Sequence, residues 1–282
     1  MKVVITGEKG YIARNVCAYL TEMGYECKCV SVREGIFNEP CDVVIHCAAI
    51  VHKREKKYAA AYKKINTDLA ADIAEASKKM GVKHFIFLSS MSVYGGDGEI
   101  NSHTPVIPDS LYGKSKFFGE RKIKALESED FKVSVIRPPM VYGKGCPGNY
   151  RKLSLFIRLS PVFPLINNKK SFIYIENLAY HIERVIKEDV SQTTRPMDPK
   201  HISTSTFAKL IAQAQGKKIF YESRFLGNIL TFFGKVKFIR KIFASRFYSE
   251  EIAVKIHYVS VEDAVIRTEE KQKNEGEAHP ED

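Results

Sequence analysis

Short apolar runs alternate with segments of helical periodicity along the first half of the chain. The first run, at residues 2–6 (KVVIT), precedes a segment whose apolar positions follow one helix face, namely Ile12, Val16, Tyr19 and Leu20. Four similar runs follow: YECKCVSV, DVVIHCAA, KHFIFLSS and KVSVIRPP. Continuous apolar runs are typical of strands buried on both faces of a parallel sheet. Their alternation with helices predicts an α/β fold of the Rossmann type, with a doubly wound parallel sheet.

The pattern becomes less regular after Val141, where glycines and a proline indicate a loop. We expect residues 1–145 to form the domain with the parallel sheet and residues 146–269 to form mostly a smaller, C-terminal lobe. A strand-like run and the helical segment after it, near 171–188, are expected to return to the first domain. Residues 270–282 are charged and poor in apolar groups, so we expect a disordered tail.

Composition is that of a globular protein, with 44% hydrophobic and 27% charged residues. We find no secretory signal, and the longest apolar stretches fall short of the ~20 residues that a membrane span needs. A cytoplasmic protein is therefore expected. The cysteines and histidines show no metal-ligand spacing, so no metal is predicted.

A formal net charge of +11 comes mostly from one basic segment rich in phenylalanine, at residues 225–247 and just before it. Such a segment could contact nucleic acid, lie on an anionic membrane, or pack its aromatic side chains into the substrate lobe. We favour packing into the lobe and predict no nucleic-acid partner. Peripheral contact with the inner membrane surface stays open as the alternative.

The first strand-to-helix connection reads TGEKGYIA and has small residues at Gly7, Gly10 and Ala13. Glycines at these positions permit a tight turn and a close approach of phosphate, while the start of the following helix favours negative charge. We therefore expect residues 1–145 to be the dinucleotide-binding domain and residues 146–269 to be mostly the substrate-binding lobe. The end of the second strand selects the cofactor. Neutral Ser31 stands where an acid would bind the ribose of NAD, and Arg33 follows, so the sequence favours NADP(H) over NAD.

Tyr112 and Lys116 are four residues apart in a predicted helix and so project from one face. A nearby ammonium is expected to lower the pKa of the Tyr112 phenol, making it a useful proton donor and acceptor. Ser90 ends a buried strand and is our candidate to hold the reacting oxygen. Ser89 and Ser92 are the neighbours that we expect to satisfy the backbone of the turn.

An ordered series of motifs resembles the extended short-chain dehydrogenase/reductase family, which includes nucleotide-sugar epimerases, dehydratases and ketoreductases. The motifs are TGEKGYIA, DVVIHCAAIV, KKINTDLA, FLSSMSVYG, YGKSK, IRPPMVYG and FIYIENLA, and HISTSTFAKLIAQAQGKK resembles the family's late substrate-lobe helix.

The resemblance implies that Ser90, Tyr112 and Lys116 are the catalytic residues. It places Asn66 beneath the cofactor, Lys116 on the nicotinamide ribose and Pro138 near the nicotinamide ring. The full set of expected cofactor contacts is Gly7, Lys9, Gly10, Tyr11, Ile12, Ser31, Arg33, Ala48, Ala49, Asn66, Ser89, Tyr112, Lys116 and Pro138. The expected substrate contacts are Ser90, Met140 and Asn149.

Departures from the family pattern bear on the reaction. Few residues separate Arg33 from the next strand, so the family's third strand is expected to be curtailed or absent. Met140 stands where 4-epimerases often place an asparagine. With Ser31 and Arg33, this favours NADPH-dependent reduction of a 4-keto nucleotide-diphosphate sugar in surface-polysaccharide biosynthesis. The alternatives are a UDP-hexose 4-epimerase with tightly bound NAD and a non-catalytic NADP-binding or membrane-surface protein. The oligomeric state is left open, with a homodimer as one option.

Overall fold

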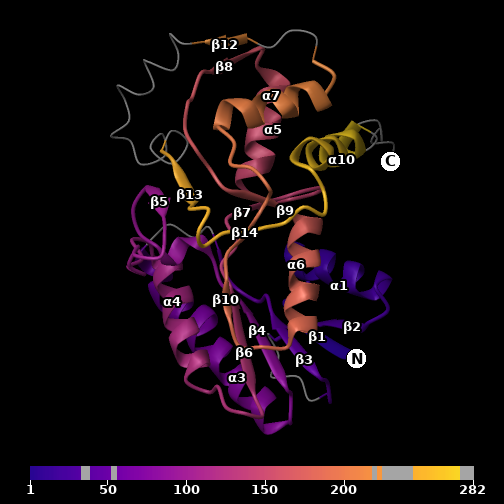
Figure 1. Ribbon diagram of the computed structural model, residues 1–282, viewed down its shortest axis with the longest axis vertical. Helices are drawn as coiled ribbons and strands as arrows, with labels where there is room; N and C mark the ends of the chain where they lie inside the picture. Colours follow the sequence, from indigo (N-terminus) through magenta and orange to yellow (C-terminus); the bar gives the residue numbers. More distant parts are fainter. Residues whose placement is uncertain (33–38, 52–55, 218–220, 224–243, 274–282) are drawn as a thin grey trace.

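The computed structural model describes residues 1–32, 39–51, 56–217, 221–223 and 244–273 (Figure 1). Its centre is a six-stranded parallel sheet in the order β10-β6-β4-β3-β1-β2. The strands are β1 (Lys2–Thr6), β2 (Glu26–Val30), β3 (Val43–His46), β4 (His84–Leu88), β6 (Lys132–Ile136) and β10 (Thr193–Thr194). The predicted Rossmann-type sheet is therefore confirmed.

The connection between β2 and β3 is short, and β2 is an edge strand of the sheet. In the part of the chain that the structure describes, no strand lies beyond β2 or between it and β3 in sequence. This agrees with the expected loss of the family's third strand.

Helices cover both faces of the sheet. On one face lie α1 (Tyr11–Glu22) and α6 (Ile175–Glu188), and on the other lie α3 (Leu69–Lys79) and α4 (Leu111–Lys124) (Figure 1). Alternate residues of β3 serve the two cores, since Val43 and Ile45 pack with α1 and α6 whereas Val44 packs with the residues under α3 and α4. Burial on both faces explains why these strands read as continuous apolar runs.

A second lobe sits at the end of the sheet where the strands finish (Figure 1). Its helices are α5 (Asn149–Leu159), α7 (Thr204–Ala214) and α10 (Val261–Lys273). Short parallel pairs complete it: β7 (Met140–Tyr142) with β9 (Phe172–Tyr174), β8 (Val162–Pro164) with β12 (Tyr221–Ser223), β11 (Pro196–Met197) with β14 (Val254–Lys255), and β5 (Gly98–Ile100) with β13 (Arg246–Tyr248).

From β7 and β9 of the second lobe the chain comes back to the sheet domain. After β9 it enters α6, which packs beside α1, where the Tyr19 hydroxyl donates to Glu183 Oε2 at 3.3 Å. It then forms β10 at the edge of the sheet. Residues 175–188 thus lie against the sheet domain, and β10 continues this return through Thr194.

Helix α10 extends into the segment that the sequence assigned to a charged tail. Helix α10 reaches Lys273, so residues 270–273, placed in the tail on sequence grounds, are helical. The helix is anchored by Glu269, a buried carboxylate that accepts from Tyr150 Oη at 2.7 Å and from Gln215 Nε2 at 2.9 Å. Residues 274–282, and residues 225–243 of the basic segment, lie outside the described residues.

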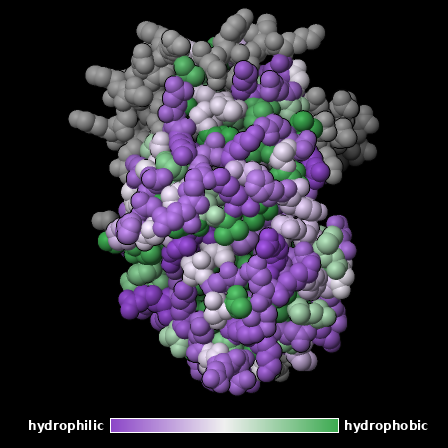
Figure 2. Space-filling view, viewed as in Figure 1, coloured by the Kyte–Doolittle hydropathy of each residue, from purple (hydrophilic) through white to green (hydrophobic). Residues whose placement is uncertain are grey.

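The face seen in Figure 2 is mostly hydrophilic, and its hydrophobic side chains form several separate patches. Scattered apolar side chains are ordinary on a globular surface. Among the helices that the structure describes, none is long and apolar enough to cross a membrane.

Candidate functional site

The turn between β1 and α1 has the form of a phosphate-binding loop. Gly7 has φ +93°, and the amides of Gly7 and Glu8 donate to Val30 O at 2.9 and 3.2 Å. A Cβ on Gly7 would lie 3.0 Å from the Ala48 backbone, and one on Gly10 would lie 2.9 Å from Gly7 O. Only glycine fits at these two positions. Gly10 is also the N-cap of α1 and carries no side chain that could cap the helix, so the amides of the first turn can face an anion.

The residues after β3 form the next wall of the site. Asn66 is fully buried and holds this loop through two hydrogen bonds, since its Oδ1 accepts from Ile50 N at 2.8 Å and its Nδ2 donates to Ile50 O at 3.0 Å. Its Nδ2 also lies 3.0 Å from Ser115 Oγ on α4. Asn66 therefore fixes the segment that carries Ala48 and Ala49 against the helix that carries Tyr112.

Asn66 lies in a feature that the sequence did not indicate. Residues Lys63–Asp68 form a π-helix, η2, between α2 (Ala59–Tyr62) and α3. π-Helical turns are rare and occur often at functional sites. Here the wider turn brings Asn66 and Thr67 against α4, where Thr67 Oγ1 donates to Ser115 O at 2.9 Å.

Ser90 and Tyr112 meet at the carboxyl edge of the sheet. Ser110 caps α4, its Oγ accepting from Gly113 N at 3.0 Å, so Tyr112 stands in the first turn of the helix. Ser90 follows β4 and caps the short helix η3 (Met91–Val93), where its Oγ accepts from Ser92 N at 3.1 Å. The Ser90 side chain lies near enough to Tyr112 to lower the pKa of its phenol. The structure thus brings together the predicted pair from two separate elements.

Lys116 stands one turn after Tyr112 and is almost fully buried. Its Nζ lies 4.3 Å from the centroid of the Phe87 ring, a cation–π contact on the sheet side of α4. Burial lowers the pKa of Lys116 to about 8, while Cys47 and Glu120 oppose this shift. The ammonium also contributes, after burial, to lowering the pKa of His46 to about 3.

The predicted direction of the Tyr112 pKa is wrong. Burial raises the pKa of Tyr112 to about 12, the interaction with Ser90 lowers it, and the neighbouring Tyr62 raises it further. Sequence spacing alone could not predict this shift, because it depends on how deeply the phenol is packed. Only a change in the surroundings that favours the phenolate would bring the pKa of Tyr112 down towards neutral pH.

Ser89, a predicted cofactor contact, bonds to a charged side chain of α4. Its hydroxyl donates to Glu120 Oε1, and the residue is buried. Glu120 is also the partner of Arg137, whose Nε and Nη2 donate to its two oxygens at 3.0 and 2.6 Å. This buried ion pair beside the site was not predicted. The position of Glu120, four residues after Lys116 on α4, was the signal available in the sequence.

The remaining predicted residues lie around the same edge with differing exposure. Pro138 O accepts from Met91 N at 2.9 Å, next to Ser90. Met140 is half-buried in β7, Asn149 is exposed as the first residue of α5, and Ser31 is exposed after β2. Lys9 is exposed in the turn, and Ile12 is half-buried at the start of α1. Arg33 lies outside the described residues.

Tyr11 differs from the other residues of the turn. Its hydroxyl is buried and has no hydrogen-bond partner among the described residues, and a Cβ on Gly143 would lie 2.5 Å from it. Burial is the main cause that raises the pKa of Tyr11 above its usual value. The side chain thus turns towards the substrate lobe, and only the backbone of Tyr11 belongs to the turn.

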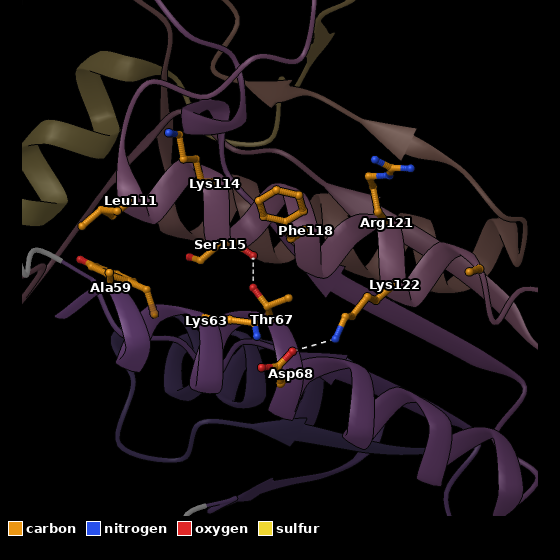
Figure 3. Close-up of a pocket in the computed structure, with 12 residues that line it drawn as sticks. Ala59, Lys63, Thr67, Asp68, Leu111, Lys114, Ser115, Phe118, Arg121 and Lys122 are labelled. Carbon is orange, nitrogen blue, oxygen red and sulfur yellow. Dashed lines mark hydrogen bonds and ion pairs between the residues drawn. The ribbon is translucent and has the colours of Figure 1, made fainter. Parts of the chain in front are cut away.

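A groove of about 620 Å³ lies on the outer side of α4, against α2 and η2 (Figure 3). It is lined by Ala59, Tyr62, Lys63, Thr67, Asp68, Leu111, Lys114, Ser115, Phe118, Arg121, Lys122 and Ala125. Lys122 Nζ donates to Asp68 Oδ1 at 2.7 Å, as Figure 3 shows. Ser90 and Lys116 do not belong to this lining as far as the described residues define it, so the groove is separate from the phosphate turn and the Ser90–Tyr112 pair.

Comparisons with known proteins agree with this geometry. Residues 30–195, well over half of the chain, match the sequence model of the NAD dependent epimerase/dehydratase family. The UDP-glucose 4-epimerase of Vibrio cholerae is 28% identical over 250 residues, which are 76% of this chain and 76% of that protein.

Solved structures share the fold across nearly the whole chain. The dTDP-4-dehydrorhamnose reductase of Bacillus anthracis, in complex with NADP, has a TM-score of 0.73 and 20% identity, covering 96% of this chain and 99% of that one. The UDP-glucuronic acid 4-epimerase of Bacillus cereus, in complex with NAD, has a TM-score of 0.76 and 19% identity, covering 99% of each chain. The glycine turn, the buried asparagine and the Ser90–Tyr112 pair therefore stand on a chain that belongs to the NAD dependent epimerase/dehydratase family.

Proposed function

We propose that this protein is a nicotinamide-dependent enzyme that exchanges a proton and a hydride at one carbon of a nucleotide-linked sugar. The observation that carries the proposal is that Ser90 and Tyr112 come together at the carboxyl edge of the sheet, with Lys116 buried one turn away. Ligands bind at this edge in open parallel sheets. The first turn of α1, which follows Gly7 and Gly10, offers backbone amides to a pyrophosphate, and Asn66 holds the wall between the turn and α4.

The chain's own residues would act on the proton. A bound nicotinamide would supply or accept the hydride. Ser90 holds the sugar oxygen against Tyr112, and the Tyr112 hydroxyl gives a proton to that oxygen in reduction or takes one in oxidation. Lys116, as an ammonium, favours the phenolate that remains after the proton is given.

We further propose NADPH-dependent reduction of a 4-keto sugar as the reaction. Ser31 is neutral and exposed directly after Val30, whose carbonyl accepts from Gly7 and Glu8, so no carboxylate stands at that position to bind a free ribose hydroxyl. Met140 is apolar where an asparagine is frequent in 4-epimerases of the resembling family. The Bacillus anthracis reductase, whose structure holds NADP, is in keeping with this reaction.

A UDP-hexose 4-epimerase with tightly bound NAD is the second candidate. It is favoured by the similarity to the Vibrio cholerae UDP-glucose 4-epimerase over 76% of the chain. An epimerase keeps its cofactor and returns the hydride to the other face of the sugar, whereas a reductase consumes NADPH.

The test is to purify the protein, identify any bound nicotinamide, and measure NADPH oxidation with UDP-4-keto-6-deoxy sugars alongside UDP-hexose epimerisation. We expect NADPH consumption that depends on the keto sugar and no stoichiometric bound NAD. A protein that carries one NAD per chain, interconverts UDP-hexoses and consumes no NADPH would replace the reductase by the epimerase.

A further inference from the structure

One buried carboxylate joins three elements of the candidate site. Glu120 lies on α4, one turn after Lys116 and two turns after Tyr112, and is 3% exposed. Its oxygens accept from Ser89, which follows β4, and from Arg137, which follows β6. Each of these partners directly precedes a residue that we place in the site, namely Ser90 and Pro138.

Arg137 extends the connection to the far end of the Ser90 loop. Its Nη1 donates to Tyr94 Oη at 2.7 Å, and Tyr94 Oη also accepts from Arg195 Nε at 2.8 Å. The Arg137 carbonyl accepts from Tyr248 Oη at 2.7 Å. The segment from Ser89 to Tyr94 is therefore held at its first residue by Glu120 and at its last by Arg137.

Backbone hydrogen bonds show that the same loop is registered against β6. Ser89 N donates to Ile136 O at 2.7 Å, and Met91 N donates to Pro138 O at 2.9 Å. These two bonds fix the position of the loop relative to the end of β6, but they do not connect the loop to α4. In the described part of the chain, the carboxylate of Glu120 is the side-chain link that ties Ser89 and Arg137 to the helix carrying Tyr112.

Burying two charges is costly unless they are paired and hydrogen-bonded. Both oxygens of Glu120 have partners, and Arg137 uses Nε, Nη1 and Nη2. A buried pair of this kind is weak support for stability, since apolar residues of similar volume often serve as well. Its position, between the serine loop and the tyrosine helix, indicates a role in geometry.

We propose that Glu120 and Arg137 form a positioning pair that locks α4 to the ends of β4 and β6 and so fixes Ser90 and Lys116 relative to Tyr112. The role in turnover rests on the proposed function, whereas the geometric role does not. Neither residue of the pair is assigned contact with the substrate. Loss of the pair should leave the phosphate turn intact while displacing Ser90, and misplacement of about 1 Å can cost ~100-fold in rate.

The first variant to test is Glu120→Gln, with Glu269→Gln as its matched control. Glu269 is equally buried and accepts from Tyr150, Ser154 and Gln215, but it joins α10 to α5 and α7 in the other lobe. We expect Glu120→Gln to lower kcat by about 10- to 100-fold and to change the Kd for NADPH less than about threefold. Glu269→Gln should lower the melting temperature and leave kcat close to that of the wild type.

A double variant, Glu120→Met/Arg137→Met, removes both charges at once and leaves no lone buried ion that would unfold the protein. The same fall in kcat is expected, in a protein with wild-type NADPH affinity. A double variant that folds and keeps the wild-type kcat would overturn the positioning role.

A readout without turnover separates this proposal from the proposed function. The ionisable groups that influence the Lys116 ammonium are His46 and Cys47 at the end of β3 and Glu120 on its own helix, and Glu120 favours the charged form. Its titration can be followed by the ε-carbon NMR signal in lysine-labelled protein without cofactor, assigned with Lys116→Met. We expect a midpoint near pH 8 in the wild type and a lower one in Glu120→Gln.

Failure of the turnover assay and failure of the Lys116 titration would reject different proposals. A wild type that turns over no sugar, with the midpoint shifted in Glu120→Gln, would reject the proposed function and keep the geometric link between Glu120 and Lys116. An unchanged midpoint in Glu120→Gln, with unchanged Glu269→Gln as reference, would show that Glu120 does not face Lys116 and would overturn the proposal.

Discussion

Two regions of this protein are built around a buried carboxylate, and their surroundings differ. At the catalytic edge (Ser90, Tyr112, Lys116 and Glu120), the carboxylate of Glu120 is paired with the guanidinium of Arg137. At the lobe joint (Tyr142, Tyr174, Asn177 and Asp198), Asp198 accepts from neutral donors: Tyr142 Oη at 2.8 Å, Tyr174 N at 3.0 Å and Asn177 Nδ2 at 2.7 Å.

The hydrogen bonds from these neutral donors lower the pKa of Asp198 by less than burial raises it. The net result is a pKa of about 6. The lobe joint is therefore expected to respond to pH and to affect stability. The catalytic edge is expected to affect turnover. The predictions below test that division, beginning with the largest effect.

Replacing Tyr112 by Phe should have the largest effect. The variant keeps the ring but loses the proton donor, so we expect kcat to fall by about 10²- to 10⁴-fold with little change in cofactor affinity. Tyr142→Phe is the matched control, since it deletes the hydroxyl that binds Asp198. It should cost about 1 kcal/mol of unfolding free energy and leave kcat nearly unchanged. Steady-state kinetics and denaturant unfolding check both; unchanged turnover in Tyr112→Phe would remove the proposed mechanism.

Replacing Gly7 by Ala tests the phosphate turn. Gly7 and Gly24, at the two ends of α1, both have positive φ, of +93° and +86°. A Cβ at Gly7 would meet Ala48 at 3.0 Å, whereas one at Gly24 would meet nothing within 4 Å. Both variants carry backbone strain of about 1–2 kcal/mol. Only Gly7→Ala should also weaken nicotinamide cofactor binding, by about 10-fold or more, as measured by calorimetry. Equal affinities in the two variants would argue against a cofactor at this turn.

The pH dependence of stability should change when Asp198 is replaced by Asn. The pKa of Asp198 is raised from 3.8 to about 6 in the folded state, so the folded state binds this proton more tightly. Lowering the pH from 7 to 4 therefore favours folding at this residue, on the order of 2 kcal/mol. Buried histidines act in the opposite direction, because burial lowers the pKa of His46, His84 and His181 from 6.5 to about 3, 4 and 4.

Removing Asp198 leaves the histidine effect unopposed. Asp198→Asn should therefore lose unfolding free energy more steeply between pH 7 and pH 4 than the wild type does. The exposed Asp72→Asn serves as the control and should follow the wild type. Parallel curves for Asp198→Asn and the wild type would show that Asp198 titrates normally.

The basic segment should have the smallest effect. The interpretation favoured in the sequence analysis predicts that the protein does not co-sediment with anionic vesicles above the level seen with neutral ones, whereas the membrane-surface alternative predicts that it does. Replacing Lys235, Lys237, Arg240 and Lys241 by Gln should change nothing in this assay. Sedimentation that depends on these four residues would favour the membrane-surface alternative instead.

The regular part of the fold was predictable because its signals are local. Apolar runs of strand length and the glycine turn at Gly7 lie within a few residues of the structure that they specify. The sequence also predicted that Ser90 and Tyr112 lie close together. Ser90 follows a buried strand, and ligands of parallel sheets bind at the carboxyl ends of the strands, where the first turn of α4 carries Tyr112.

The features that sequence reasoning missed depend on contacts between distant residues. Arg137 is 17 residues from Glu120 and lies on another element. Helix α10 continues to Lys273 with Glu269 bound to Tyr150, which is 119 residues away. The pKa of Tyr112 depends on packing depth, which spacing on one helix does not reveal. The π-helix at Asn66 is stabilised by its contacts with Ser115.

The central claim is that Tyr112 moves a proton while a nicotinamide moves a hydride at the same sugar carbon. The most direct test uses NADPH carrying deuterium at the transferable position, a UDP-4-keto-6-deoxy sugar, and mass spectrometry of the product. We predict one deuterium on the reduced sugar for each NADPH consumed by the wild type, and a rate of deuterium incorporation about 10²- to 10⁴-fold lower with Tyr112→Phe. A reduced sugar without deuterium, or equal incorporation by Tyr112→Phe, would contradict the account.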